Sequence, residues 1–128
     1  MRLLLDTHTL IWWATSSEKL SQSGLDLLTN LDNRLFFSIA SVWEMQIKCQ
    51  IGKLKLGKSV QELIVNQQNN NNLHILPIEL AHVYALGNLP DVHRDPFDRI
   101  IVAQAVVESL PILSIDSLLD GYPIQRIW

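Results

Sequence analysis

The sequence of 128 residues contains one cysteine, Cys49, and few charged residues, which make up 18% of the chain. A lone cysteine excludes an intrachain disulfide framework and a thiolate metal cluster. No uninterrupted apolar run approaches the ~20 residues that are needed to span a bilayer. Asp6 and His8 interrupt the N-terminal apolar stretch, which therefore lacks the pattern of a secretory signal. We expect a cytoplasmic globular protein with no membrane segment, formed by a single domain over residues 1–128.

A strong positive charge is also missing, because the formal net charge is −3. Proteins that bind nucleic acids usually carry a basic surface, so this balance counts against such a partner. Clustered carboxylates contribute to the negative total, however, and bound divalent cations would reverse the charge locally. One basic stretch consists of Lys48, Lys53, Lys55 and Lys58. It could contact a phosphate backbone, although solvated side chains at a helix end and in a loop are the simpler interpretation.

Short apolar runs alternate with segments of helical periodicity along the chain. The predicted strands are 2–6, 34–38, 73–76 and 111–115, with 124–128 as a fifth at the edge. The predicted helices are 7–14, 21–31, 40–50, 59–68, 78–87 and a last one from residue 95 or 96 to 109. The asparagine tract 69–72 is expected to form a loop. This alternation implies parallel crossovers, and therefore a three-layer α/β/α sandwich with a four- to five-stranded parallel sheet.

Two aspartates follow apolar strands: Asp6 comes directly after Leu3–Leu5, and Asp116 after the strand 111–115. The carboxyl ends of parallel strands lie at the edge where open α/β sheets bind their ligands. Carboxylates grouped at this edge would be hard oxygen ligands for Mg²⁺ or Mn²⁺. Each aspartate also has a simpler interpretation, because an acid before a helix can cap the free backbone N–H groups of the first turn.

The segment Asp95-Pro96-Phe97-Asp98 has the composition of a helix start. Asp95 as N-cap, Pro96 at the first helical position and Asp98 in the first turn suit a helix N-terminus without any metal. Arg99 lies beside these acids and could pair with one of them or reach a substrate phosphate. In a simple crossover we expect this first turn to start on the side of the domain opposite the strand ends. Spacing alone therefore does not bring Asp98 to the other acids.

Capping does not explain Glu44, which lies inside the predicted helix 40–50. The apolar residues of this segment include Ile39, Val42, Trp43 and Ile47. An acid close to such a stripe can be drawn to the edge of the core, where an unpaired charge is costly. The alternative is that Glu44 lies one position round, on a solvated face, and pairs with Lys48 four residues later.

Four blocks of the chain follow one another in a recognisable order: Leu5–His8, Ser38–Glu44, Asp95–Ala105 and Ser114–Asp116. Together they resemble the PIN domain family, and most of all its toxins of VapC type. The resemblance covers nearly the whole chain and keeps the Asp-Pro-Phe-Asp-Arg core of the third block intact. It implies a parallel sheet of four or five strands between helices, and an endoribonuclease that depends on Mg²⁺ or Mn²⁺.

By position, the resemblance assigns the family's four acidic site residues, as metal ligands and catalytic groups, to Asp6, Glu44, Asp98 and Asp116. It implies in-line hydrolysis of an RNA phosphodiester by a metal-activated water, with one or two ions. Asp95 is a further acid that is common in this subgroup, and we expect it to be a supporting residue or a helix cap. Thr7 and Ser114 flank the acids and could fix their orientation, and Arg99 is a further supporting residue.

The resemblance also implies partners. Members of this subgroup are typically homodimers, held inactive by a small antitoxin that is encoded beside them and whose C-terminal segment covers the acidic groove. RNA would be the substrate. We therefore expect an RNA substrate, a cognate antitoxin and a second copy of this chain.

Three alternatives remain open at this point. A catalytically inactive PIN-like scaffold could use Trp12, Trp13 and Trp128 as aromatic anchors for a protein partner. A metal-dependent phosphatase of haloacid-dehalogenase type would need a second aspartate where this chain has His8. A phospho-accepting receiver domain would need an acid pair after its first strand. Neither of these last two families accounts for all four blocks.

Overall fold

Five strands form a parallel sheet in the order β3-β2-β1-β4-β5 in the computed structural model, which describes residues 1–128. The strands are β1 (Arg2–Leu5), β2 (Arg34–Ser38), β3 (His74–Leu76), β4 (Ile112–Leu113) and β5 (Arg126–Ile127). The α-helices are α1 (Thr7–Thr15), α2 (Gln22–Thr29), α3 (Ile39–Gln50), α4 (Val60–Asn71), α5 (Leu80–Ala85) and α6 (Pro96–Glu108). Three 3₁₀ segments are η1 (Ser17–Lys19), η2 (Leu86–Asn88) and η3 (Ser117–Gly121).

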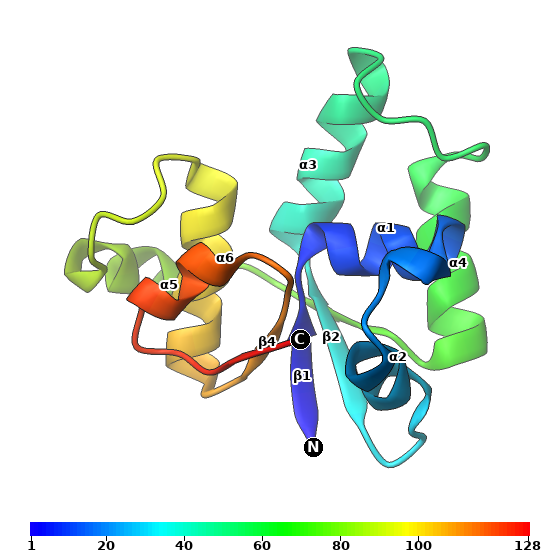
Figure 1. Ribbon diagram of the computed structural model, residues 1–128. Coiled ribbons are helices and arrows are strands. Elements are labelled where there is room, and N and C mark those ends of the chain that lie inside the picture. Colours follow the sequence, from blue (N-terminus) through cyan, green and yellow to red (C-terminus); the bar gives the residue numbers. More distant parts are fainter.

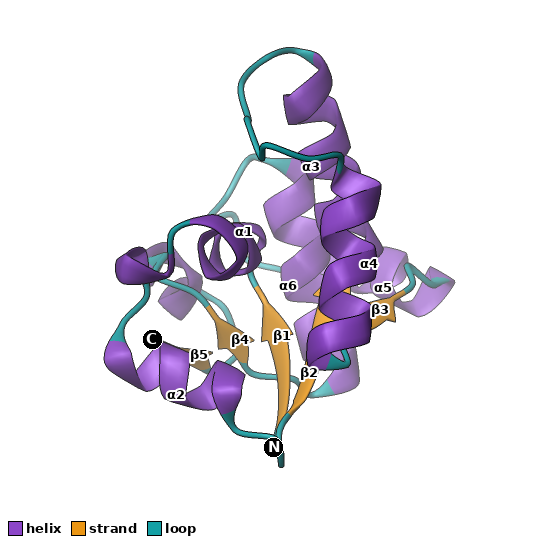
Figure 2. Cartoon of the chain, turned by 90° about the vertical axis from the view of Figure 1, so that its right-hand side faces the viewer, coloured by secondary structure: helices purple, strands orange, loops and turns teal.

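Helices cover both faces of the sheet, with α1, α2 and α4 on one side and α5 and α6 on the other (Figures 1 and 2). The three leucines of β1 show how the chain builds these layers. Leu3 and Leu5 join the core cluster on the first side, and Leu4 joins the one on the second. All three are fully buried, because successive strand residues point to opposite faces of a sheet covered on both sides. The predicted α/β/α sandwich with its parallel sheet is confirmed.

Most element boundaries lie within a few residues of the prediction, but the asparagine tract does not form a loop. Helix α4 continues through Asn71, and Asn72 ends it in the left-handed conformation, at φ 52°. The Asn71 side-chain amide donates to Gln67 Oε1 at 2.8 Å, one helical turn earlier. This pairing supports the last turn, and asparagine tolerates the left-handed region better than most residues do. The prediction of a loop was therefore wrong for 69–71.

Helix α6 also ends on a residue with left-handed backbone, Ser109, at φ 54°. A glycine there avoids the clash between Cβ and backbone, so Ser109→Gly is expected to raise the free energy of unfolding by about 1 kcal/mol. Urea denaturation measures this change. The matched control is Ser23→Gly on the exposed face of α2, where the helix is right-handed and glycine should lower stability. An equal loss in both variants would contradict the expectation.

No helix combines the length and the apolar composition needed to cross a membrane.

Candidate active site

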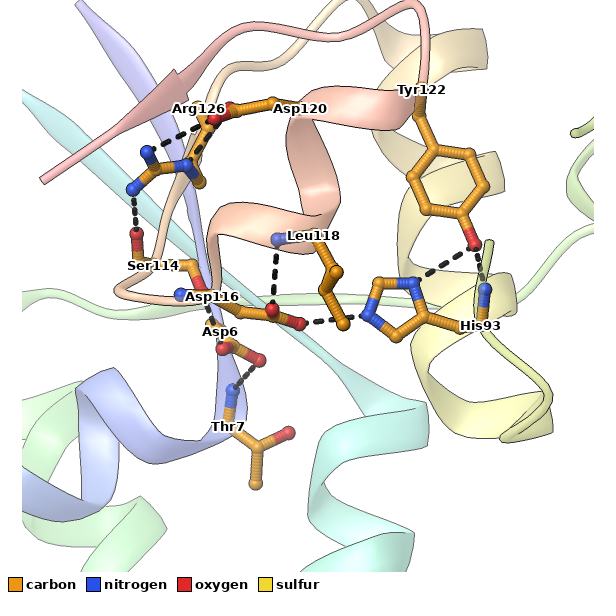
Figure 3. A network of polar contacts seen from close by, with 9 residues as sticks. All are labelled: Asp6, Thr7, His93, Ser114, Asp116, Leu118, Asp120, Tyr122 and Arg126. Carbon is orange, nitrogen blue, oxygen red and sulfur yellow. Dashed lines mark hydrogen bonds and ion pairs between the residues drawn. The ribbon is translucent and has the colours of Figure 1, made fainter. Parts of the chain in front are cut away.

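The first two acids meet because their strands are parallel neighbours. Leu5 of β1 pairs with Leu113 of β4, and the Asp6 backbone N–H donates to the Leu113 carbonyl at 3.1 Å. Asp6 and Asp116 therefore leave the sheet at the same edge, as expected from the sequence (Figure 3).

Ser114 connects these two acids. Its hydroxyl donates to Asp6 Oδ2 at 2.7 Å and accepts from the Asp116 backbone N–H at 3.0 Å. The Ser114 side chain is fully buried, and its carbonyl accepts from the Arg126 guanidinium at 3.1 Å. Thr7 contacts Asp6 through its backbone N–H, which donates to Oδ1 at 2.8 Å. The Thr7 hydroxyl instead donates to Ser41 Oγ on α3, at 2.9 Å.

Asp98 joins the same edge from the first turn of α6. Asp6, Asp98 and Asp116 line a single pocket, closed by the apolar side chains of Ile101, Ile112 and Leu119. The pocket has about 10 Å³ of free space, close to what a single water molecule needs. The three acids come from elements that are far apart in the sequence, so only the fold brings them together.

The expectation that α6 starts on the opposite side of the domain was wrong. β3 ends at the carboxyl edge of the parallel sheet, and α6 then runs back past the sheet so that β4 can start at the other edge (Figure 1). The helix of a parallel crossover therefore begins near the carboxyl ends of the strands. This direction places Asp98 in the pocket of Asp6 and Asp116.

Glu44 lies on α3, which starts directly after β2 at the same edge. Both interpretations of this residue hold in part: its side chain is buried, and Oε2 lies 3.1 Å from Lys48 Nζ. The predicted apolar stripe was wrong at two positions, since Trp43 is 61% exposed and Ile39 is 45% exposed. Trp43 packs edge-on against Phe97 of α6, with ring centroids 5.1 Å apart.

The electrostatics show that the acids are close enough to affect one another. Burial is the main cause that raises the pKa of Asp98 to about 6, followed by the nearby carboxylate of Asp95. Asp6 and Glu44 also raise this pKa, and His93 opposes the shift. Burial likewise raises the pKa of Asp6, with a smaller contribution from Asp116, against the hydrogen bond from Ser114. Asp6, Glu44 and Asp95 thus act on Asp98, and Asp116 acts on Asp6.

The simpler role of the aspartates is present as well. Asp6 caps α1 through the Thr7 amide, and Asp95 caps α6 by accepting from the Phe97 N–H at 2.8 Å. Asp116 Oδ1 accepts from the Leu118 N–H at 3.1 Å and caps η3. Because a carboxylate oxygen has two lone pairs, a capping bond leaves acceptor capacity for a second partner. Capping and clustering are therefore compatible.

Arg99 does not pair with Asp95 or Asp98, so that interpretation was wrong. Its guanidinium donates to the Pro90 carbonyl at 2.9 Å and to the Leu86 carbonyl at 3.4 Å. A wider pocket of about 640 Å³ opens here, lined by Asp91, Val92, His93, Arg94 and Arg99. Arg99 thus braces the segment that leads into α6, beside the acidic pocket.

His93 and Tyr122 were not predicted to be neighbours of the acids. His93 Nε2 lies 2.8 Å from Asp116 Oδ2, and Tyr122 contacts the other side of the same imidazole. The position of His93, just ahead of the capping acid Asp95, was the available pointer in the sequence.

The donor set fits a hard divalent cation in its chemistry. Asp6, Asp98 and Asp116 offer carboxylate oxygens to one pocket, and such oxygens are the ligands that Mg²⁺ and Mn²⁺ prefer. In the positions that the structure gives them, no three or more acidic, histidine or cysteine side chains are arranged to hold a metal ion together. The three carboxylates therefore share one pocket and have the right chemistry, but their positions do not form a ligand set for one ion.

A parallel α/β sandwich with acids at the carboxyl edge of its central strands defines the class of this protein. The PIN domain model matches residues 3–123, and the chain belongs to the PIN domain family. Membership in this family supports a nuclease.

Several solved structures share the fold over almost their whole length. VapBC2 from Rickettsia felis, bound to a DNA fragment from its promoter, has a TM-score of 0.76 and 16% identity, with 99% of this chain and 98% of that chain covered. FitAcB from Neisseria gonorrhoeae has a TM-score of 0.68 and 16% identity, with 98% and 96% covered. DNA-bound VapBC from Salmonella typhimurium has a TM-score of 0.68 and 15% identity, with 99% and 97% covered. The comparison with curated protein sequences gave no match.

Proposed function

We propose that this protein is an endoribonuclease that depends on Mg²⁺ or Mn²⁺, and that it is the toxin of a type II toxin–antitoxin pair. The observation that carries the proposal is the pocket lined by Asp6, Asp98 and Asp116 at the carboxyl edge of a PIN fold. Glu44 supports it as a buried acid that raises the pKa of Asp98.

Asp6 and Asp98 are the proposed ligands of the principal cation, and Glu44 and Asp116 complete its shell or that of a second one. When bound, such a cation lowers the pKa of water and neutralises charge that develops on phosphoryl oxygens during in-line hydrolysis. Burial in the pocket raises the pKa of both Asp6 and Asp98, so a bound counter-charge would favour their charged forms.

The neighbouring groups hold the acids in place. The Thr7 amide and the Ser114 hydroxyl each bind one oxygen of Asp6, so its carboxylate cannot rotate freely. Asp95 caps the helix that presents Asp98, and Arg99 braces the segment before that helix. We assign these four residues supporting roles, with the acids as the groups that act on the substrate.

The similarity to the VapBC and FitAcB structures supports a cognate antitoxin as protein partner. We further propose that the toxin acts in the cytoplasm as a homodimer. Light scattering on the purified protein measures its oligomeric state, and a mass of one chain would contradict the homodimer.

The test of the nuclease uses protein freed from any partner and a labelled single-stranded RNA. We expect cleavage with Mg²⁺ or Mn²⁺, loss of cleavage with EDTA, and recovery when excess Mn²⁺ is returned. Hydrolysis of a phosphomonoester without cleavage of RNA would favour a phosphatase. Absence of both activities would favour the inactive scaffold.

A further inference from the structure

His93 lies in the segment before α6 and contacts one of the acids from outside the pocket. Its side chain is 8% exposed, and Nε2 is 2.8 Å from Asp116 Oδ2. Nδ1, on the other side of the ring, is 3.0 Å from the hydroxyl of the buried Tyr122. The two rings are stacked, with centroids 5.5 Å apart and planes 10° from parallel. Figure 3 shows the resulting row from Tyr122 through His93 to Asp116.

The partners of the two ring nitrogens define which of them donates to Asp116. The His93 backbone N–H donates to Tyr122 Oη at 2.9 Å. Asp116 Oδ2 is a carboxylate oxygen and only accepts, so Nε2 is the donor in that contact, and the Tyr122 hydroxyl can donate its own proton to Nδ1. Every polar atom of the row has a partner in this arrangement.

The backbone that carries His93 is seated closely on η3. A Cβ atom on Gly121 would lie 2.9 Å from Val92 Cγ2, so Gly121 leaves the space that Val92 fills. Tyr122 follows Gly121 directly, and it binds the backbone of His93 as well as its ring. Adjacent residues on the two segments therefore make both an apolar and a polar contact, which sets the position of the imidazole.

We propose that His93, whose Nε2–H donates to Asp116 and whose Nδ1 is bound by the Tyr122 hydroxyl, is a positioning residue for Asp116; this inference rests on the proposed function. The Leu118 N–H binds Oδ1 and His93 binds Oδ2, so both oxygens of Asp116 are oriented. Each oxygen keeps a lone pair for a cation. The hydrogen bond from Nε2–H fixes the direction in which the carboxylate presents Oδ2.

The effect extends to the second acid through Ser114. The Asp116 backbone N–H donates to Ser114 Oγ, whose hydroxyl donates to Asp6 Oδ2. His93 and Ser114 thus contact Asp116 from two sides. Because Ser114 also binds Asp6, the positions of the two carboxylates are linked. The imidazole acts through Asp116 and is not assigned a contact with the substrate.

The test compares His93→Leu, which removes the donor, with His93→Gln, whose amide N–H can take the place of Nε2–H. Mn²⁺ binding is measured without RNA by electron paramagnetic resonance, and RNA cleavage is measured across Mn²⁺ concentrations. We expect His93→Leu to weaken Mn²⁺ binding by roughly 10- to 100-fold with little change in the KM for RNA, and His93→Gln to restore most of the affinity. His74→Leu, at an exposed histidine of β3, is the matched control and should bind Mn²⁺ normally.

A spectroscopic measurement keeps the proposal testable if His93→Leu does not fold. The ¹⁵N shifts of the His93 ring should show a proton on Nε2 in the wild-type protein. Unchanged Mn²⁺ affinity in His93→Leu, or the Nδ1–H tautomer in the wild type, would overturn the proposal. A further outcome is that the wild type binds Mn²⁺ more tightly than His93→Leu and yet cuts no RNA. In that case the proposed nuclease activity is wrong and the positioning role of His93 stands. No Mn²⁺ binding by the wild type would overturn both.

Discussion

Asp6→Asn is expected to reduce the metal-dependent rate of RNA cleavage by at least 100-fold. Asp6 is the acid at the end of the central strand β1, and its carboxylate lines the pocket with Asp98 and Asp116. Asparagine keeps the size of the side chain and the ability to cap α1, so the fold should persist. The variant loses one negatively charged ligand. A loss of about 3 kcal/mol in the stabilisation of charge in the transition state corresponds to a rate that is roughly 100-fold lower.

Single-turnover cleavage of a labelled RNA, with the protein in excess, measures this rate directly. Asp32→Asn is the matched control, because Asp32 is an exposed acid in the loop before β2, at the opposite edge of the sheet. The control should cleave at the wild-type rate. Wild-type cleavage by Asp6→Asn, with its fold verified by circular dichroism, would remove Asp6 from the site.

Mn²⁺ is expected to raise the melting temperature of the protein by on the order of 10 °C when its concentration is 100 times its dissociation constant. Binding to the folded state alone then adds about 2.7 kcal/mol to the free energy of unfolding, and each kcal/mol shifts the melting temperature of a domain of this size by about 4 °C. The reason is the pocket of Asp6, Asp98 and Asp116, where burial and neighbouring acids disfavour the charged forms of Asp6 and Asp98. A divalent cation supplies the missing counter-charge.

The stability of the protein should also depend on pH, through Asp98. The folded state raises the pKa of Asp98 from its ordinary value of 3.8 to about 6. The folded protein therefore binds this proton more tightly than the unfolded chain does. In the absence of metal, stability falls as pH rises from about 4 to about 6, and the loss remains above pH 6. Stabilisation by Mn²⁺ has the opposite trend, because the cation needs the charged carboxylate, and it should shrink as pH falls through 6.

Asp98→Asn separates these two effects. Without metal, the variant should be more stable than the wild type at pH 7.5, by about 1 kcal/mol or less because solvent screens the partly exposed carboxylate, and equally stable near pH 4. With Mn²⁺ at pH 7.5, the wild type should gain more than the variant. Thermal melts of both proteins at both pH values, with and without Mn²⁺, measure stability under all four conditions. An equal Mn²⁺ gain in both proteins would contradict the assignment of Asp98 as a ligand.

The sheet could be predicted because its causes are local. The run Leu3–Leu5 is apolar at every position, which is typical of a strand covered on both faces, and helical segments between such runs require parallel crossovers. Asp6 and Asp116 follow from the same reasoning, since a residue just after a parallel strand lies at the carboxyl edge whatever the helices do. The boundary of α4 was missed because asparagine suits both a helix end and a loop.

The sequence by itself therefore determined the parallel sandwich and the edge at which the first and last acids lie, because alternation and strand direction are properties of short segments. Only the tertiary structure decided that Asp98 faces their pocket, that Glu44 is buried while Trp43 is exposed, and that His93 binds Asp116. These placements depend on the direction and rotation of packed helices and on a loop seated against η3. Such packing joins residues far apart in the chain, and no local pattern of residues encodes it.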